Sequence, residues 1–323
     1  MLKRICLFSL LIIMWSCQAQ ENKILLSLDS FTITSDLPVY KHITTSENGN
    51  VEYKETYKYV EDISMYHMSY LSDGLKINGM VVKPKKHGKY PCIIFNRGGS
   101  RNFGKLTPYN AVMQMGNLAK EGYVVIASQY RGNAKSEGRE EFGGADVNDI
   151  TILPNVLAEI EEADTSKIGM YGWSRGGMMT YIALTRMTNL KAVVTGGART
   201  DLLDIDRPKM ELNVYAQLIP RYWENKEREL KKRSAVHLVD KFPKTVPILM
   251  LHGNADWRVK SKESLKLALK LDEYRIPYRL KIFEGGDHSL SEFRDEVSEE
   301  VLHWFNSYLK EQSPLPNMEF HGN

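Results

Sequence analysis

The sequence feature that most constrains this chain is the run Gly172-Trp173-Ser174-Arg175-Gly176-Gly177 with its two flanks. Residues 167–171 form a short apolar run typical of a buried parallel strand, and residues 178–184 carry apolar side chains at helical spacing. Small residues two positions before and after Ser174 permit a tight, strained turn between the strand and the helix. We therefore predict a nucleophile elbow, in which the Ser174 hydroxyl projects over the carboxyl edge of a sheet.

The predicted turn also places the backbone N–H of Arg175 in the first turn of a helix. N–H groups there have no partner within the helix, and the helix dipole favours negative charge beside them. We expect the Arg175 N–H to donate to an oxyanion formed when Ser174 attacks a carbonyl. The bare Gly-x-Ser-x-Gly pattern arises by chance in about one chain of this length in ten, so the rest of the sequence must support it.

An elbow of this kind requires an acid and then a histidine, each placed after a later strand. The apolar run 246–251 is followed by a loop with Asp256, and the run 278–283 is followed by a loop with His288. We predict that Ser174 attacks the carbonyl carbon, that His288 carries the proton to the leaving group, and that Asp256 orients the imidazole.

Two other side chains compete for these roles. Asp287 adjoins His288, but neighbours in a tight loop rarely point the same way, so Asp256 is the preferred acid. His252 also follows a strand, yet it precedes the loop of the acid, and we predict a structural hydrogen-bonding role for it.

The second oxyanion donor is expected after the apolar strand 90–95. Gly98 and Gly99 follow this strand and allow the backbone to approach a substrate closely. The alternative is that the two glycines only permit a turn. We favour the donor role because the loop stands at the chain position of a hydrolase oxyanion loop.

Strands and helices alternate along most of the chain, and every crossover is long enough for a parallel connection. We predict an α/β fold with a mostly parallel open sheet, helices on both faces and a small helical insertion. Two antiparallel strands, 65–72 and 75–84, open the sheet. The expected segments are a signal peptide (1–17), an N-terminal extension (18–64), a catalytic domain (65–311) with an insertion (200–245), and a C-terminal tail (312–323).

The composition excludes several classes of protein and site. The formal net charge of +3 falls to +1 without Lys3 and Arg4, so we expect no nucleic-acid partner. Of three cysteines, Cys6 lies in the leader, which excludes a disulfide framework. No two of the eight histidines stand three or four residues apart, so we expect no metal site, and we predict no organic cofactor.

The first residues are typical of a bacterial export signal. Lys3 and Arg4 precede an apolar stretch, 5–15, that is too short to span a bilayer in the usual way. Cys17 follows a small residue, as in lipoprotein signals, and a lipidated Cys17 would tether the protein to a membrane. Ordinary cleavage after Ala19 is the alternative. Either route predicts an exported protein, in the periplasm or attached to the outer membrane.

Several motifs together resemble the catalytic domain of the prolyl oligopeptidase family of serine peptidases. They are the elbow with Met179-Thr180, Tyr130-Arg131-Gly132, residues 143–149, His252-Gly253 through Val259, and Asp287-His288. The resemblance covers roughly residues 65–310. It implies an α/β-hydrolase fold, the triad named above, and a peptidase or related esterase acting on a small peptide or ester.

The sequence departs from this family at two points. Members typically carry a β-propeller before the catalytic domain, which restricts access to the active site. We expect this propeller to be absent here because only some tens of residues precede position 65. Their oxyanion loop commonly reads His-Gly-Gly or supplies a tyrosine hydroxyl, whereas Arg97 precedes Gly98 and Gly99 here. A backbone donor survives this change, and Arg97 could instead bind an anionic substrate group.

The insertion 200–245 lies where hydrolases often place a cap over the serine. Its Tyr215, Tyr222 and Trp223 could line the acyl pocket, although a helix packed on the domain would show the same pattern. Together with Trp173 beside the serine, they are our candidate substrate-binding residues.

These observations predict an exported serine hydrolase, most simply a peptidase that works through an acyl-enzyme. A carboxylesterase that removes acyl or feruloyl groups from carbohydrates is the first alternative. A non-catalytic binding protein on a hydrolase scaffold is the second, but such a protein would not need all three of Ser174, Asp256 and His288. The elbow serine argues against dienelactone hydrolases and haloalkane dehalogenases, which use Cys and Asp nucleophiles.

Overall fold

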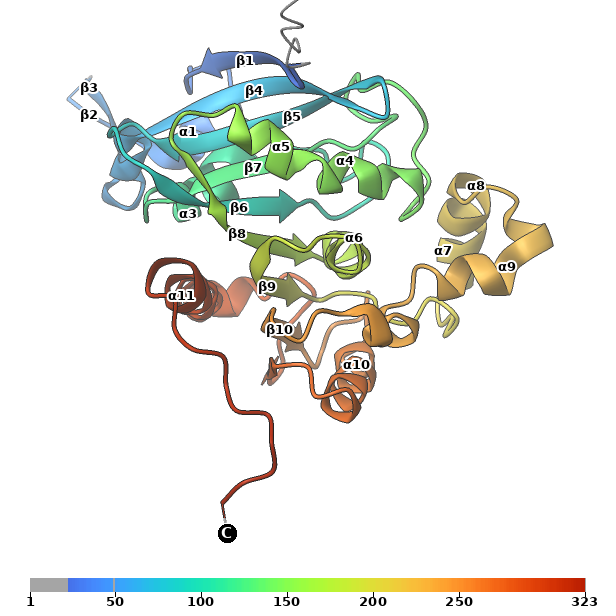
Figure 1. Ribbon diagram of the computed structural model, residues 1–323. Coiled ribbons are helices and arrows are strands. Elements are labelled where there is room, and N and C mark those ends of the chain that lie inside the picture. Colours follow the sequence, from blue (N-terminus) through green and yellow to red (C-terminus); the bar gives the residue numbers. More distant parts are fainter. Residues whose placement is uncertain (1–22, 49, 323) are drawn as a thin grey trace, which may run out of the picture.

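A computed structural model describes residues 23–48 and 50–322 of the chain. The predicted signal peptide 1–17, its lipidation site Cys17 and the alternative cleavage after Ala19 lie outside the described residues. Figure 1 shows one large twisted sheet flanked by helices, with a smaller lobe of helices to one side.

The large sheet has nine strands in the order β1-β4-β5-β7-β6-β8-β9-β10-β11. The strands of this sheet are β1 (Leu25–Phe31), β4 (Ile63–Ser72), β5 (Leu75–Pro84), β6 (Tyr90–Asn96), β7 (Val124–Ser128), β8 (Ala163–Trp173), β9 (Leu190–Gly196), β10 (Ile248–Gly253) and β11 (Tyr278–Phe283). Neighbours from β7 to β11 are parallel, and the pairs β1/β4, β4/β5 and β5/β7 are antiparallel. The predicted mostly parallel α/β sheet is therefore confirmed.

The predicted antiparallel pairing of 65–72 with 75–84 is confirmed, but this pair does not open the sheet, because β1 precedes it at the edge. Ser72 of β4 faces Leu75 of β5, so only Asp73 and Gly74 form the turn. Both turn residues have positive φ, 50° for Asp73 and 76° for Gly74, as a tight hairpin turn requires.

The described residues of the segment 18–64 contribute to the large sheet. Its strand β1 pairs with β4 at the edge, and the Glu159 carboxylate accepts the backbone N–H groups of Ile24 and Leu25. The same segment holds α1 (Tyr40–Ile43), the 3₁₀ helix η1 (Glu55–Asp62), and a two-stranded sheet of β2 (Thr44–Glu47) and β3 (Asn50–Tyr53).

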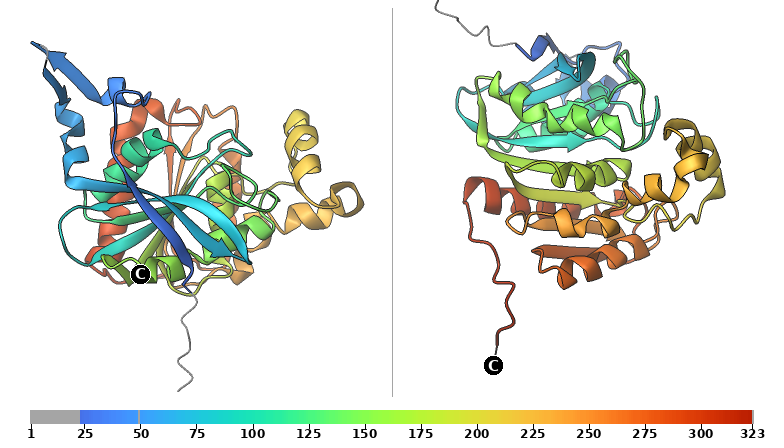
Figure 2. Two further views of the ribbon diagram at one scale, coloured as in Figure 1. Left: turned by 90° about the horizontal axis from the view of Figure 1, so that it is seen from above. Right: turned by 45° about the vertical axis from the view of Figure 1, so that its right-hand side comes forward.

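Helices cover both faces of the sheet, as the two views in Figure 2 show. One face carries α4 (Asn148–Thr151), α5 (Leu153–Ala158), α6 (Arg175–Leu184) and α10 (Lys262–Glu273). The other carries α2 (Pro108–Asn110), the π-helical turn η2 (Ala111–Gly116), α3 (Asn117–Ala119) and α11 (Arg294–Phe305) with its π-helical extension η8 (Asn306–Lys310). The chain also contains the short 3₁₀ helices η3 (Ala145–Val147), η5 (Ala235–His237), η6 (Val239–Lys241) and η7 (Ser291–Phe293).

The helical segment that precedes β8 is divided. It consists of η3, α4 and α5, and Pro154 stands in the first turn of α5. Proline has no backbone N–H and clashes with the preceding turn, so it is tolerated there but not inside a continuous helix.

Between β9 and β10 the chain forms the lobe seen at the right of Figure 1. The lobe contains α7 (Pro208–Met210), the π-helical turn η4 (Glu211–Tyr215), α8 (Ala216–Leu218) and α9 (Tyr222–Lys231). Its position is that of the predicted insertion 200–245.

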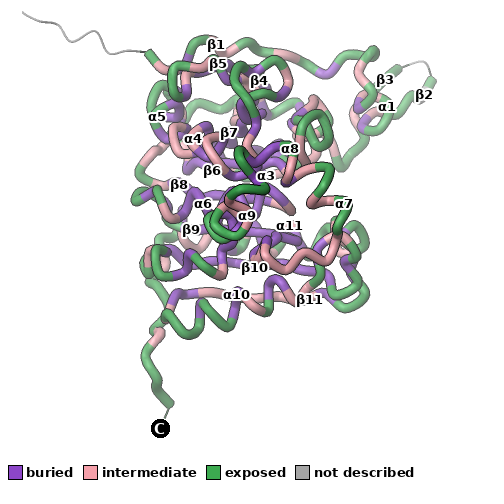
Figure 3. Tube along the Cα trace, turned by 90° about the vertical axis from the view of Figure 1, so that its right-hand side faces the viewer, coloured by how far each residue is buried: buried purple, intermediate pink, exposed green. Residues whose placement is uncertain are grey.

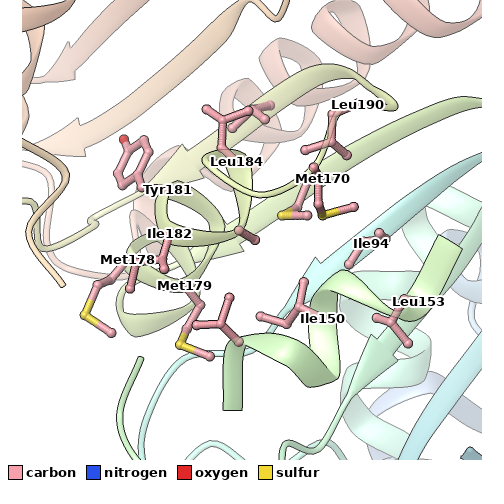
Figure 4. Close-up of a cluster of buried hydrophobic side chains, with 14 of the residues drawn as sticks. Ile94, Ile150, Leu153, Met170, Met178, Met179, Tyr181, Ile182, Leu184 and Leu190 are labelled. Carbon is pink, nitrogen blue, oxygen red and sulfur yellow. The ribbon is translucent and has the colours of Figure 1, made fainter. Parts of the chain in front are cut away.

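The elbow helix α6 lies in the middle of the core, and all ten of its residues are buried. Figure 3 shows that buried residues follow the central strands. Met178, Met179 and Ile182 of α6 belong to one apolar cluster with Ile150 of α4 and Leu153 of α5 (Figure 4). The serine turn is therefore fixed on a helix that is packed on every side.

Candidate active site

Ser174 sits in a strained turn between β8 and α6. Its backbone has φ 57° and ψ −122°, a region that residues with a Cβ rarely adopt. A Cβ on Gly172 would collide with the Gly176 carbonyl, and a Cβ on Gly176 would collide with the Asn96 carbonyl. The spacing of small residues around the serine thus has the steric cause that the elbow motif predicts.

His288 and Asp256 meet beside this turn although their positions are 32 residues apart. The Nδ1 atom of His288 lies 2.6 Å from Oδ2 of Asp256. Nδ1 therefore carries the proton, which leaves Nε2 as the basic nitrogen of the neutral ring. Among the described residues no hydrogen bond joins Ser174 Oγ to His288, and such bonds often close only when substrate binds.

Asp256 is fixed as a carboxylate. Its Oδ1 accepts the backbone N–H groups of Arg258 at 2.8 Å and Val259 at 2.9 Å. Burial alone would raise its pKa, but hydrogen bonds from His252, His288 and Val259 outweigh burial and hold the pKa well below its ordinary value. Asp256 is thus charged at every pH at which an imidazole can act as a base.

Backbone contacts tie the loops of the serine and the histidine together. The Ser174 N–H donates to Gly196 O at 2.8 Å. Gly197, with φ 50°, packs so closely under the imidazole that a Cβ there would lie 3.3 Å from Cε1 and Nδ1 of His288. The Trp173 indole N–H donates to the His288 carbonyl at 2.8 Å.

Neither competing side chain takes a place in the triad, although His252 Nε2 lies 3.4 Å from Asp256 Oδ2. His252 is fully buried, with Nδ1 at 2.7 Å from Ser264 Oγ and Nε2 at 2.8 Å from the Val259 carbonyl, so it braces the acid loop. Asp287 is exposed and accepts the backbone N–H of Ser289 at 2.8 Å. The structure thus places Asp256, and not Asp287, against the imidazole.

The loop after β6 passes directly over the elbow. A Cβ on Gly98 would lie 3.1 Å from Trp173 O and 3.4 Å from Ser174 Cβ. Gly99 has φ 71°, and a Cβ there would collide with the Phe103 carbonyl. Within the described chain no acceptor is bonded to the N–H groups of Gly98, Gly99 or Arg175, so they are available to an oxyanion.

Arg97 stabilises this loop, because its guanidinium is bonded to backbone carbonyls. Its side chain is 2% exposed, and burial lowers its pKa to about 10. All five of its N–H donors reach backbone carbonyls, those of Gln129, Gly98, Phe103 and Arg101. The expected role in binding an anionic group is therefore not supported, because no donor is left to make the contact.

The Arg175 side chain joins the two halves of the oxyanion site. Its guanidinium pairs with Glu140 and contacts Asp146 at 2.6 Å, both buried, and it donates to the Gly99 carbonyl at 3.0 Å in a part-buried contact. Glu140 in turn accepts the Arg101 N–H at 2.8 Å. Arg175 thus supplies one backbone donor and fixes the loop that carries the other.

Sequence reasoning missed this charged cluster. Asp146 is fully buried and accepts the Gly143 N–H as well as Arg175. Arg131 and Asp149, which belong to the motifs of the family resemblance, form a second buried pair at 2.7 Å. No local periodicity marks such pairs, since their members are far apart in the chain.

Ser174 and His288 open onto a cavity of about 460 Å³. Trp173, Gly98 and Gly99 also line it, as expected of residues that contact substrate or the oxyanion. The cavity extends between η2 and α11, where Met113, Val301 and Leu302 face it.

The aromatic residues of the lobe do not reach this cavity. Tyr215 is buried against Phe142, with ring centroids 5.3 Å apart, and Tyr222 donates its hydroxyl to Glu211. Trp223 is 63% exposed and packs edge-on against Tyr222. These contacts fit the alternative in which the insertion packs on itself and on the domain.

The described residues include no group of three or more His, Cys, Asp or Glu side chains arranged to hold a metal ion. In the same part of the chain, no helix combines the length and the apolar character needed to cross a bilayer. What the site does contain is a serine, an imidazole, a carboxylate and unpaired amide donors, the groups required for acyl transfer.

Curated proteins similar to this chain are peptidases. It is 28% identical over 230 residues to the uncharacterized peptidase YtmA of Bacillus subtilis, which covers 71% of this chain and 87% of that protein. It is 26% identical over 255 residues to human dipeptidyl peptidase 8, covering 73% of this chain but only 27% of that protein. The chain thus spans little more than a quarter of the dipeptidyl peptidase that it matches.

Two solved structures of similar fold are also of peptidases. The acylaminoacyl peptidase of Pyrococcus horikoshii superposes with a TM-score of 0.68 at 24% identity, over 85% of this chain and 45% of that one. A puromycin-hydrolyzing peptidase of Mycobacterium tuberculosis gives a TM-score of 0.67 at 22% identity, over 81% and 43%. At these identities the likeness establishes the α/β-hydrolase fold.

A family model described as the prolyl oligopeptidase family matches residues 110–312. The match spans more than half of the chain and includes Ser174, Asp256 and His288. The fold, the triad geometry and this match agree, and the chain belongs to the prolyl oligopeptidase family of serine hydrolases.

Proposed function

We propose that this protein is an exported serine peptidase that hydrolyses amide bonds of small peptides through an acyl-enzyme on Ser174. The observation that carries the proposal is the 2.6 Å contact between Asp256 and His288 Nδ1, next to a strained serine that opens on the same cavity as the imidazole. The peptidases among the relatives support amide bonds as the substrate.

In the first half of the reaction Ser174 Oγ attacks the carbonyl carbon of the scissile bond. His288 Nε2 takes the hydroxyl proton, and the carbonyl oxygen becomes an oxyanion that accepts hydrogen bonds from the N–H of Arg175 and of the Gly98–Gly99 loop. When the C–N bond breaks, the imidazolium returns the proton to the leaving nitrogen. The products are a free amine and an ester of Ser174.

In the second half a water molecule replaces the amine. His288 takes one of its protons, the hydroxide attacks the ester carbon, and the C–O bond to Ser174 breaks as the proton returns to Oγ. Asp256 stays ionised throughout and stabilises the imidazolium in both halves.

The Arg175 guanidinium acts on this reaction through the oxyanion loop. It donates to the Gly99 carbonyl, and Glu140 accepts the Arg101 N–H. These two hydrogen bonds fix the Gly98–Gly99 peptides before substrate binds. Donors that are fixed in advance need no reorganisation when the oxyanion forms. Arg175 is thus a positioning residue in addition to a backbone donor.

Export is supported by the sequence before the described residues. Lys3 and Arg4 with the apolar stretch 5–15 match a signal peptide, and Cys17 provides a site for a lipid anchor.

The first prediction concerns Ser174. A fluorophosphonate probe should label the wild type and should not label Ser174→Ala, because only the hydroxyl can form the covalent bond. Wild type that has not been treated with the probe should hydrolyse peptide anilides, with acetyl and feruloyl esters as comparison substrates. Folded wild type that resists the probe would rule out the enzyme, and turnover of the esters alone would rule out the peptidase.

The second prediction concerns Asp256. An unfolded aspartate has a pKa of about 3.9, whereas folded Asp256 titrates lower, so below about pH 4 the unfolded chain takes up the proton first. The free energy of unfolding of wild type should exceed that of Asp256→Asn, and this difference should be constant above about pH 5 and should shrink on acidification. Urea unfolding of both proteins between about pH 3 and pH 7 measures the difference in their free energies of unfolding. A difference that does not change with pH would contradict the low pKa of Asp256.

The third prediction concerns Arg175. Arg175→Lys keeps a positive charge beside Glu140 and Asp146 but cannot bridge them to Gly99, so kcat should fall by at least about 10-fold with little change in KM. Affinity for a boronic acid transition-state analogue should fall in parallel. The matched control is Arg233→Lys, at another buried arginine, which bonds Phe142 O and Glu229. Equal losses of kcat in both variants would assign Arg175 a purely structural role.

The fourth prediction concerns export. In a bacterial host the labelled protein should be found outside the cytosol, with an N-terminus at Cys17 or after Ala19 by mass spectrometry. If Cys17 is lipidated, Cys17→Ala should release the protein from the membrane fraction. A cytosolic protein that keeps residues 1–17 would refute export.

A further inference from the structure

We propose that the cavity beside Ser174 binds the leaving group of the substrate, and that this leaving group is a C-terminal residue with an apolar side chain and a free carboxylate. The inference rests on the proposed peptidase function and adds its substrate class, peptides cleaved near their C-terminus.

The position of the cavity relative to His288 identifies the side of the substrate that it holds. After the attack, the imidazolium must donate its proton to the leaving nitrogen, so the leaving group lies on the histidine side of the serine. The cavity is lined by the residues that follow the histidine, Ser289 to Ser291, and then by Val297 and Val301 of α11. A chain that leaves Ser174 past the imidazole therefore enters this cavity.

The inner part of the cavity is apolar. Phe95 and Tyr171 reach it from β6 and β8, Met113 from η2, and Leu290 and Val301 from the side of α11. Phe95 and Tyr171 pack edge to face with centroids 5.6 Å apart, and Tyr171 packs in the same manner on Trp173 at 6.4 Å. A rigid apolar wall of this kind suits an aliphatic or aromatic side chain.

The charge along the cavity has one sign. Among the described residues that line it are Arg97, Arg258 and Arg294 but no aspartate or glutamate. The N–H donors of Arg97 are all bonded to backbone carbonyls. Arg258 and Arg294 have no carboxylate within 4.0 Å in the described parts of the chain, so both can accept an anionic partner.

The Arg258 guanidinium is held in place without a counter-ion. It lies 5.3 Å from the ring centre of Trp257 and 5.9 Å from that of Phe103, and its backbone N–H is fixed by the triad carboxylate of Asp256. The Arg207 guanidinium also lies 5.2 Å from the ring centre of Trp257, and it donates to the Arg258 carbonyl at 3.2 Å. Arg207 thus adds a further positive charge beside Arg258.

This arrangement fits a carboxylate better than an internal peptide bond. The planar guanidinium presents paired donors that match the two oxygens of a carboxylate. The buried arginines Arg131, Arg175 and Arg233 are each paired with a carboxylate of this chain, whereas half-buried Arg258 is not. A peptide that ends in this cavity would supply the missing charge.

The test compares two N-acylated dipeptides that share the acyl part. One is N-benzoyl-alanyl-phenylalanine with its free carboxylate, and the other is its C-terminal amide. Wild type should cleave the free acid with a kcat/KM about 10- to 100-fold above that of the amide, the range expected for one charge-assisted contact. Arg258→Gln should reduce this preference towards equality, and Arg294→Gln should reduce it in part.

Two further variants separate charge from shape. Arg228→Gln removes an equal charge from an exposed position on α9 outside this cavity, and it should keep the preference of wild type. Val301→Trp should fill the inner cavity, so that cleavage before phenylalanine falls while cleavage before glycine, in N-benzoyl-alanyl-glycine, persists.

The outcomes distinguish this inference from the proposed function. Equal cleavage of acid and amide by wild type, with Ser174 labelled by the probe, would overturn the inference and leave the peptidase standing. If the probe labels Ser174 but untreated wild type cleaves none of these peptides and hydrolyses only esters, both the inference and the proposed function would be overturned. Loss of the preference in Arg228→Gln as well would overturn the assignment to Arg258.

Discussion

The structure depends on a close approach between two backbone segments, the turn at Ser174 and the end of β6. Gly176 lies directly against the carbonyl of Asn96, and Gly172 lies against Gly176, so neither position has room for a Cβ. This packing forces Ser174 into its strained conformation. The strain is sustained because α6 is buried along its whole length, and the surrounding core keeps the turn from relaxing.

The same approach brings the oxyanion loop to the serine, since that loop begins where β6 ends. Its shape is then fixed by buried charge. Arg97 donates to carbonyls within the oxyanion loop, and Arg175 connects the loop to Glu140 and Asp146. Buried ion pairs seldom add stability over apolar packing, but they specify geometry because any other arrangement leaves a charge unpaired. Here the geometry that they specify is that of the amide donors.

The sequence allowed the sheet and the triad to be predicted, because both are recorded in short local patterns. Apolar runs gave the strands, and β5 and β11 have the predicted bounds. The order of serine, acid and histidine at strand ends indicated which side chains converge, and the structure places Asp256 against His288. These predictions needed no knowledge of long-range contacts.

The remaining features depend on contacts between distant residues. Arg97 was considered as an anion-binding residue because its sequence position does not reveal that five carbonyl contacts surround it. Tyr215, Tyr222 and Trp223 looked like pocket residues because apolar periodicity does not say which surface a helix covers. The roles of Glu140 and Asp146 were missed since a buried carboxylate looks like a surface one in sequence.

The central claim is that hydroxyl, imidazole and amide donors converge on a single point above the sheet edge. A crystal structure of the protein with a phosphonate bound covalently to Ser174 measures this directly. We expect one phosphonyl oxygen within about 3.2 Å of the Arg175 N–H and of an N–H in the Gly98–Gly99 loop, with His288 still bonded to Asp256. A phosphonyl oxygen that points to solvent, or an imidazole turned away from both the adduct and Asp256, would contradict the account.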